Sequence, residues 1–202
     1  METGERYKIP EGYRNHFNLK ETEIAIKQVK DFFERELSKA LNLTRVSAPL
    51  FVVNGTGIND NLNGTERPVS FDALDIKAGN LEIVQSLAKW KRMALYRYGF
   101  SSGEGLYTDM NAIRRDEILD AIHSIYVDQW DWEKVIDKAD RNIDTLKSIV
   151  GKIFNVFKNT EKYVAELYPE INSILPEEIF FITSQELEDM YPTLSAKDRE
   201  DS

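Results

Sequence analysis

The sequence His123-Ser-Ile-Tyr-Val-Asp-Gln-Trp-Asp-Trp-Glu133 alternates in the manner of a β-strand. Because successive side chains of a strand point to opposite faces, we expect Gln129 and Asp131 to share one face. The opposite face then carries Asp128, Trp130 and Trp132. An amide and a carboxylate two residues apart on one face can bind the ammonium group of a small zwitterion. The stretch therefore predicts a strand that carries part of a binding site.

A second segment, Gln85-Ser-Leu-Ala-Lys-Trp-Lys-Arg92, reads as the start of a helix. Lys91 can supply a cation for a carboxylate, and together the two segments suggest a pocket for an amino acid with an acidic side chain. On residue types alone, however, such a cluster of lysines and arginine is more often a solvated helix face. The tryptophans of the two segments are likewise more often core residues than ligand-binding ones.

The composition excludes several classes of protein. The chain has 202 residues, of which 30% are charged, and it can bury a sizeable core. Its net charge of −9 argues against a general nucleic-acid binder. The absence of cysteine rules out disulfides, thiolate zinc sites and cysteine nucleophiles. Neither a secretory signal nor an apolar run of about 20 residues is found, so we expect a cytoplasmic protein without a membrane segment.

Hydrophobic periodicity predicts the remaining elements. Asn18 and Glu21 resemble a capping box at the start of a long amphipathic helix. A strand with Pro49 inside it follows, and because proline cannot donate a ladder hydrogen bond we expect this strand at a sheet edge or at an interface. The expected strands are 44–53, 69–74, 81–85, 105–114, 122–132 and 178–182, and the expected later helices are 87–98 and 143–167, with further helix starts at Thr183 and Ser195.

Other polar motifs are weaker. The turn Arg114-Arg-Asp-Glu117 can clamp a phosphate with paired arginine donors and accept an amino group with its glutamate, but it is equally a simple polar turn. Gly55-Thr-Gly57 lacks the rest of a phosphate loop, and 59–70 lacks the final glutamate of a calcium loop. The two histidines make no metal-ligand pattern, so no residue is assigned to a metal.

We expect one domain over residues 1–202. A last helix start directly before Ser202 suggests that the sequence is cut from a longer protein, because so short a helix cannot hold itself.

Several long strings resemble the ammonia-dependent asparagine synthetases, the A-type aspartate–ammonia ligases. They are Val46-Ser-Ala-Pro49, Asp60-Asn-Leu-Asn-Gly64, Ser86-Leu-Ala-Lys-Trp-Lys-Arg92, Phe100-Ser-Ser-Gly-Glu-Gly-Leu-Tyr-Thr108, Val127-Asp-Gln-Trp-Asp-Trp-Glu133 and Ser184-Gln-Glu-Leu187. The resemblance runs from about Thr22 to the end. It implies an α+β fold, an antiparallel sheet flanked by helices, as in the catalytic core of class II aminoacyl-tRNA synthetases. It also implies a homodimer, with the first helix and the strand ending at Pro49 in the interface.

The resemblance assigns roles on the amino-acid side. Gln85 and Ser86, with Lys91, are similar to the segment in which a lysine holds the side-chain carboxylate of the substrate. Gln129 and Asp131 resemble the pair that meets the amino acid.

On the nucleotide side, Arg114 is implied to hold the α-phosphate of ATP, and Glu117 to lie near adenine. The usual spacing between arginine and glutamate fits Arg115 instead, whereas the ligase pattern points to Arg114. Asp60 is implied to orient ammonium and to take its proton.

The implied activity makes asparagine from aspartate, ammonia and ATP through an aspartyl-adenylate, with Mg²⁺ and with release of AMP and pyrophosphate. The third motif and the acidic metal-binding residues of the family are missing from this sequence, so the 202 residues alone are expected to be inactive. Two alternatives remain: a fragment of an aspartyl- or asparaginyl-tRNA synthetase, and a non-catalytic paralogue that binds asparagine.

Overall fold

The computed structural model describes residue 9 and residues 11–60, 62, 64–77 and 79–202. The chain divides into two compact units, Met1–Thr160 and Glu161–Ser202. The single domain expected over residues 1–202 stays a prediction. No helix in the described ranges is both long and apolar enough to cross a membrane.

Helix α1 spans Leu19–Leu41, as the periodicity predicts. The predicted capping box is confirmed: Asn18 Oδ1 accepts from the Glu21 N–H at 2.9 Å, and Glu21 Oε2 accepts from the Asn18 N–H at 2.9 Å. These two bonds satisfy amide donors that the first turn leaves free. At the other end, Asn42 has a left-handed φ of 56°, so the chain leaves the helix and enters a strand at once.

The single strand expected over residues 44–53 is wrong. The structure has two short strands instead, β1 (Leu43–Arg45) and β2 (Phe51–Val53), which belong to different sheets. Pro49 lies between them and offers no N–H to continue a ladder. Both strands lie at a sheet edge, which confirms the expected edge position.

The main sheet has the order β1-β5-β6. Strands β5 (Gly105–Ile113) and β6 (Tyr126–Lys134) are antiparallel, with Thr108 opposite Asp131 and Met110 opposite Gln129. Strand β6 begins later than expected, so the connection between the two strands is longer. The sheet is not wholly antiparallel, because β1 pairs with β5 in parallel.

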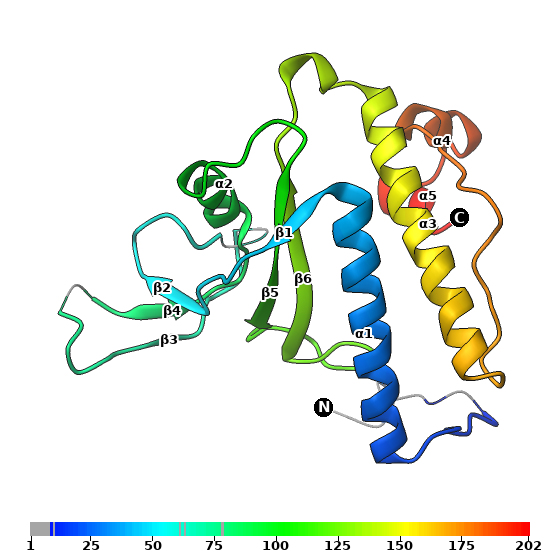
Figure 1. Ribbon diagram of the computed structural model, residues 1–202, viewed down its shortest axis with the longest axis horizontal. Coiled ribbons are helices and arrows are strands. Elements are labelled where there is room, and N and C mark those ends of the chain that lie inside the picture. Colours follow the sequence, from blue (N-terminus) through cyan, green and yellow to red (C-terminus); the bar gives the residue numbers. More distant parts are fainter. Residues whose placement is uncertain (1–8, 10, 61, 63, 78) are drawn as a thin grey trace. The chain divides into compact units, whose positions relative to one another are not determined.

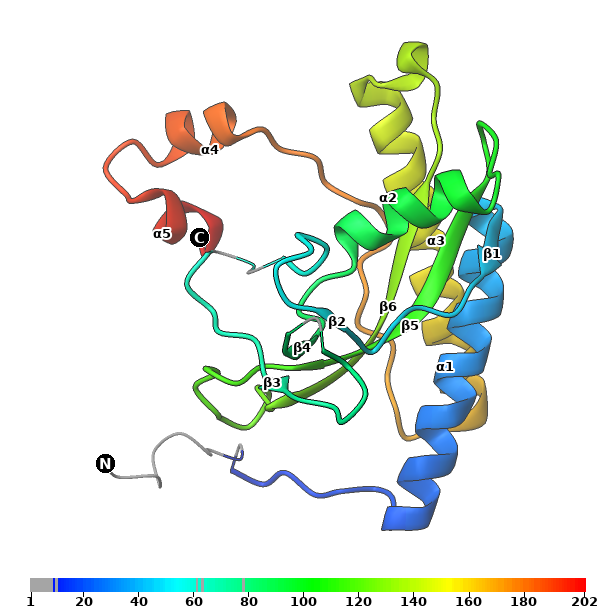
Figure 2. The same ribbon diagram turned by 90° about the vertical axis from the view of Figure 1, so that its left-hand side faces the viewer.

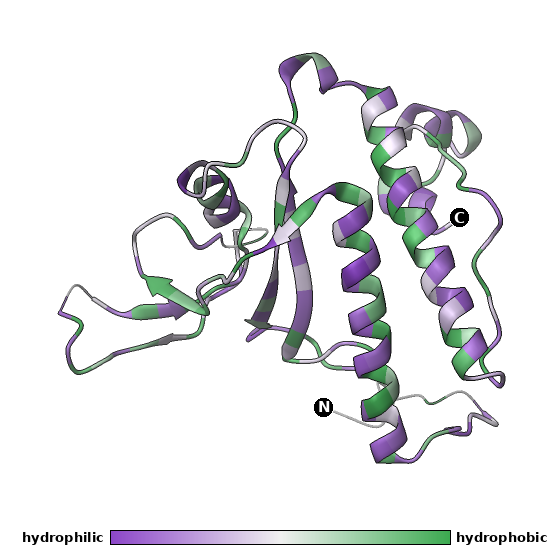
Figure 3. Cartoon of the chain, in the orientation of Figure 1, coloured by the Kyte–Doolittle hydropathy of each residue, from purple (hydrophilic) through white to green (hydrophobic). Residues whose placement is uncertain are grey.

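Helices cover both faces of this sheet (Figure 1). On one face, α2 (Ala88–Arg97) packs against the β5 side chains Leu106, Met110 and Ala112. On the other face, α1 and α3 (Ile143–Leu167) enclose a second cluster that includes Leu37, Leu41 and Val156. Figure 3 shows the apolar and polar sides of α1 and α3. Each buried leucine contributes about 1.5–3 kcal/mol, so these clusters hold the sheet and the helices together.

A second, antiparallel sheet has the order β2-β4-β3, with β3 over Ser70–Phe71 and β4 over Leu81–Ile83. Figure 2 shows that the connection between β5 and β6 reaches the segment that leads into β3. Sheets and helices are mixed along the chain, which confirms the α+β fold class.

The second unit contains α4 (Ser184–Met190) and α5 (Ala196–Glu200), both at predicted starts. Arg199 holds the two together, because it pairs with Glu188 at 3.1 Å and donates to the Tyr191 carbonyl at 3.1 Å. The strand expected over residues 178–182 is wrong. A strand needs a partner for its backbone groups, and the described residues pair no strand with this segment.

Candidate active site

The segment between β4 and α2 carries the predicted residues Gln85 and Ser86. Asn59 fixes this segment: its Oδ1 accepts from the Gln85 N–H at 2.8 Å, and its Nδ2 donates to the Ile83 carbonyl at 3.2 Å. Ser86 Oγ accepts from the Ala88 N–H at 3.2 Å at the entry to α2. The loop that contains Asn59 is therefore held against the end of β4, and with it the neighbouring residue Asp60.

The side chain of Gln85 is 3% exposed, and its Oε1 has no hydrogen-bond partner among the residues that the structure describes. An unpaired buried carbonyl costs about 1–3 kcal/mol, and such groups in folded proteins call for an explanation. Gln85 lines a cavity of about 270 Å³ together with Leu62, Glu66 and the turn Arg114–Glu117. A ligand with an N–H or O–H donor would satisfy this carbonyl.

The turn after β5 brings Arg114 and Glu117 into the same cavity. The Glu117 N–H donates to the Arg114 carbonyl at 3.2 Å, which closes the turn. Arg114 Nη1 donates to the backbone carbonyl of Gln85 at 3.4 Å, whereas Arg115 Nη1 donates to the backbone carbonyl of Pro68 at 3.4 Å. Both arginines line the cavity, but it is Arg114 that contacts the predicted substrate segment.

Asp116, in the middle of this turn, forms an ion pair that the sequence did not predict. Its carboxylate accepts from Arg67 Nε at 3.2 Å and from the Arg67 backbone N–H at 3.0 Å, and it also bonds to Arg67 Nη2. These hydrogen bonds lower the pKa of Asp116 from 3.8 to about 2. No local pattern around Arg67 could have indicated this contact, because its partner lies in a distant part of the sequence.

Lys91 lies in the first turn of α2 and is buried against β6. Its Nζ bonds to the Asp131 carboxylate, donates to the Trp132 carbonyl at 2.9 Å and lies 3.6 Å from Glu133 Oε2. Asp131 thus faces α2, as the alternation predicts. Glu133 is a further neighbour that the same alternation could have revealed, since it follows Asp131 by two positions.

Gln129 belongs to the same strand face as Asp131, opposite Met110 in the ladder. Its Nε2 lies 3.1 Å from Met110 Sδ, a weak acceptor, so a stronger partner can displace this contact. Asp60 forms an ion pair with Lys89 at 2.5 Å, next to the start of α2. The structure therefore brings Asp60 to this helix start but pairs it with Lys89 rather than Lys91. Asn61 and Asn63, which belong to the string quoted above, lie outside the described residues.

The opposite face of β6 is structural. Trp130 stacks on Phe33 of α1, with ring centroids 5.5 Å apart, and Lys30 pairs with Asp128 at 2.6 Å. Trp132 packs against the cluster between α1 and α3, and Trp90 is buried in the cluster beneath α2. The interpretation of the tryptophans as core residues is confirmed for Trp90, whereas Trp130 and Trp132 are half-buried.

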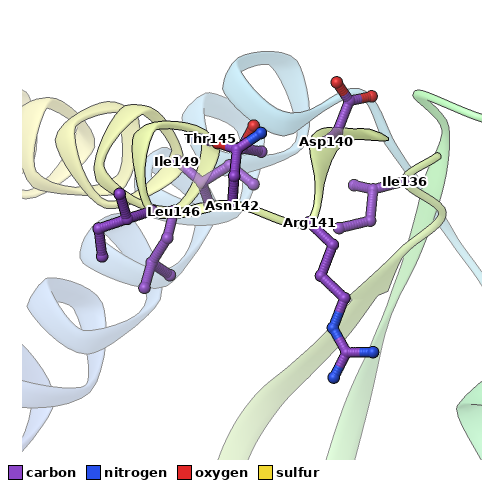
Figure 4. A pocket seen from close by; sticks show the side chains of 8 residues that line it. Ile136, Asp140, Arg141, Asn142, Thr145, Leu146 and Ile149 are labelled. Atoms are coloured by element: carbon purple, nitrogen blue, oxygen red, sulfur yellow. Dashed lines mark hydrogen bonds between the residues drawn. The ribbon is translucent and has the colours of Figure 1, made fainter. Parts of the chain in front are cut away.

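A separate pocket of about 450 Å³ lies where the 3-10 helix η2 (Lys138–Asp140) leads into α3 (Figure 4). It is lined by Ile136, Leu146 and Ile149 together with polar side chains that include Arg141. None of the predicted site residues lines it.

Comparison with solved structures finds class II synthetases. A putative aspartyl-tRNA synthetase from Leishmania major is 16% identical, with a TM-score of 0.49, and the match covers 81% of this chain and 32% of that one. The asparaginyl-tRNA synthetase of Entamoeba histolytica is 12% identical, with a TM-score of 0.46, over 74% of this chain and 32% of that one. We base no conclusion on matches at this level.

Comparison of sequences is far more specific. Proteins named aspartate–ammonia ligase are 65% identical over 191 residues in Ruminiclostridium cellulolyticum and 65% identical over 196 residues in Clostridium perfringens. The match covers 95% and 97% of this chain, but only 57% and 58% of those relatives. The chain thus spans somewhat more than half of their length. The sequence model of the family described as aspartate-ammonia ligase matches residues 20–202, and this chain belongs to that family.

Proposed function

We propose that the protein carrying this chain makes asparagine from aspartate, ammonia and ATP, with release of AMP and pyrophosphate. One observation carries the proposal beyond family membership: Gln85, whose buried side-chain carbonyl is unpaired among the described residues, lines a cavity with Arg114 and Glu117. A polar cavity with a cation, a carboxylate and an orphan acceptor suits a charged ligand that also has N–H donors.

The reaction takes two steps, because a carboxylate is a poor electrophile. First, an oxygen of the β-carboxylate attacks the α-phosphorus of ATP, and the bond from that phosphorus to pyrophosphate breaks. The product is an aspartyl-adenylate. Ammonia then attacks the acyl carbon, loses a proton, and AMP leaves with the electrons of the broken C–O bond.

Lys91, Gln129 and Asp131 form the amino-acid side of the proposal. Lys91 would hold the β-carboxylate, and Asp131 with Gln129 would receive the α-ammonium. Lys91 and Asp131 bind each other, so each faces a group of the sign that the substrate supplies. Aspartate would insert between them, while Glu133 at 3.6 Å and the Trp132 carbonyl keep Lys91 in place. Positioning of this kind can lower a barrier by several kcal/mol.

Arg114 and Glu117 form the nucleotide side. The guanidinium would neutralise charge that builds on the α-phosphate during the first step. Glu117 would accept from the amino group of adenine. Gln85 would accept from an N–H of the bound ligand, and Ser86 would line the same entry to α2.

Asp60 would act in the second step, in which it orients ammonium and takes the proton that the nucleophile loses. Its ion pair with Lys89 holds the carboxylate close to the start of α2.

Magnesium is the metal that the family resemblance implies, but the described residues do not form a site for it. They contain no group of three or more side chains suited to hold a metal ion. Asp116, two residues after Arg114, is paired with Arg67. No residue is therefore assigned to Mg²⁺.

The remaining expectations belong to the same proposal. The protein acts in the cytoplasm as a homodimer, with α1 and β1 at the interface, and binds no nucleic acid. Membership of the ligase family argues against a tRNA synthetase fragment. We also expect the 202 residues alone to form no asparagine, since the family resemblance assigns further ATP contacts to segments outside them.

The test is aspartate-dependent exchange between ATP and pyrophosphate, followed by asparagine formation when ammonium is added. Both should occur with the protein that contains this chain at the length of its relatives, and asparagine formation should be absent with the 202 residues alone. Charging of tRNA with aspartate or asparagine would identify a synthetase instead. Asparagine binding without either reaction would identify the non-catalytic paralogue.

A further inference from the structure

Beside the cavity, hydrogen bonds and an ion pair join two short segments that are far apart in the sequence, 67–68 and 115–116. Arg67 binds Asp116 with its guanidinium and with its backbone N–H at 3.0 Å, and Arg115 Nη1 reaches the Pro68 carbonyl at 3.4 Å. Each segment thus supplies an arginine to the other. A guanidinium that meets both oxygens of one carboxylate fixes orientation as well as distance.

These contacts connect the two sheets of the first unit. Directly after Pro68, the Val69 carbonyl accepts from the Ile83 N–H at 2.9 Å, which ties this segment to β4. On the other side, the Arg114 N–H donates to the Ile125 carbonyl at 2.7 Å, which ties the turn to the start of β6. The pair of Arg67 and Asp116 therefore sets how the turn after β5 lies against the end of β4.

The two cavity walls depend on this arrangement. Asp116 lies two residues after Arg114 and directly before Glu117, and Gln85 follows β4 on the opposite wall. These walls are also joined by the 3.4 Å hydrogen bond from Arg114 Nη1 to the backbone carbonyl of Gln85. A shift of the turn would move Arg114 and Glu117 away from Gln85.

The pair also decides the local charge. Without Arg67, the Asp116 carboxylate would face the same cavity as Arg114 with less of its charge balanced, and it would repel the phosphates of ATP. The bonds from Arg67 lower the pKa of Asp116 to about 2. The carboxylate is therefore ionised, and the guanidinium of Arg67 balances its negative charge.

We propose that Arg67 and Asp116 form a clasp that positions Arg114 and Glu117 for the nucleotide, and that Arg67 is a positioning residue of the ATP site. This inference rests on the proposed function, because it takes ATP as the ligand of that wall. It adds two residues that neither the sequence motifs nor the family resemblance assigns.

The test compares Arg67→Gln, Asp116→Asn and the double variant in the protein that contains this chain at the length of its relatives. ATP is titrated into each protein, and the backbone amide signals of residues 114–117 are followed by NMR, which also measures weak affinities. Each single variant should weaken ATP binding about tenfold, the scale of coupling between residues in contact. The double variant should lose no more than the single ones. The hydrogen-exchange protection of the Glu117 amide should fall in all three.

Arg45→Gln is the matched control. Arg45 makes a similar pair with Asp109, at 2.8 Å and 3.2 Å, and it also joins two strands, β1 and β5. Neither residue lines the cavity. This variant should leave ATP binding unchanged, which separates the clasp from a general effect of losing a surface ion pair.

The outcomes distinguish the proposed ATP-binding role of the site from the proposed positioning role of the clasp. Failure of the unsubstituted protein to bind ATP would overturn the nucleotide role of the site, and this inference with it. ATP binding that Arg67→Gln and Asp116→Asn leave unchanged would overturn the clasp alone. So would equal losses in these variants and in Arg45→Gln, or losses that add in the double variant.

Discussion

Lys91 in the first turn of α2 is bonded to Asp131 on β6, and the lysine is buried while the carboxylate remains 24% exposed. The two groups belong to segments 40 positions apart. Each group has the charge that complements one end of an aspartate zwitterion. The ion pair balances the charge of the buried ammonium, which would be costly if it were left uncompensated.

Replacement of Lys91 by alanine should cripple aspartate-dependent exchange between ATP and pyrophosphate in the full-length enzyme. The carboxylate loses its positioning cation, and a misplaced reacting group costs on the order of 10²-fold in rate. Glu133→Gln should cost much less, because Glu133 lies 3.6 Å from Lys91 and Asp131 still holds the lysine. Exchange at the wild-type rate in Lys91→Ala would remove this lysine from the site.

Asp60→Asn should damage ammonia transfer more than adenylate formation, because the carboxylate is proposed to serve the second nucleophile. The measurement compares ATP–pyrophosphate exchange with asparagine formation in the same preparation. Lys89→Gln is the control, since it breaks the ion pair of Asp60 but keeps the carboxylate, and exposed pairs of this kind contribute at most about 1 kcal/mol. Equal damage to both steps by Asp60→Asn would indicate that Asp60 binds aspartate instead.

Gln85→Met should distinguish a role of the Gln85 amide in ligand binding from a role in the stability of the fold. It replaces a buried amide whose carbonyl is unpaired by an apolar side chain of similar length, so the free energy of unfolding should stay unchanged or rise by about 1 kcal/mol. The aspartate-dependent exchange should nevertheless fall. Denaturant unfolding measures the stability, and the rate of aspartate-dependent ATP–pyrophosphate exchange measures the activity. Lower stability with unchanged exchange would show that the amide serves the fold alone.

The acid titration of Asp116 should depend on Arg67. Since its pKa is lowered from 3.8 to about 2, the stabilisation by this pair is present above pH 3.8 and is lost as the pH falls toward 2. Arg67→Gln removes the main cause, and the pKa of Asp116 should rise toward 3.8. Carbon NMR of the carboxyl group measures it, and a pKa that stays near 2 in this variant would contradict the assigned cause.

Gly105→Ala should destabilise the main sheet. A Cβ at this position would lie 2.5 Å from the Glu133 carbonyl oxygen and 2.7 Å from Leu43, and the first of these is backbone that cannot move aside. We expect a loss of about 1–3 kcal/mol in the free energy of unfolding.

The control is Gly151→Ala in α3, where a Cβ meets nothing within 4 Å. There alanine should stabilise by about 0.5–1 kcal/mol, because it favours the helix. Thermal or denaturant unfolding of both variants decides. A Gly105→Ala protein as stable as wild type would contradict the close approach of β1 and β6 around this glycine.

Local sequence patterns predicted the features that depend only on residues a few positions apart. The capping box of Asn18 and Glu21 starts α1 because both bonds lie within one turn of helix. The alternation around Gln129 and Asp131 gave the correct strand faces because the side-chain period of a strand does not depend on its partners. Glu133 belongs to the same alternating segment, so the sequence could predict both carboxylates near Lys91, Asp131 and Glu133.

Only the tertiary structure decided how these elements meet. The division of residues 44–53 between two sheets depends on which strand each half can pair with, and no local signal carries that. The segment 178–182 has strand-like residues but no partner strand among the described residues, and its composition could not show this. Likewise, the unpaired carbonyl of Gln85 and the pairing of Arg67 with Asp116 arise only when distant segments close around one cavity. Periodicity is a property of a few neighbouring residues, whereas a contact between distant residues depends on the packing of the whole unit.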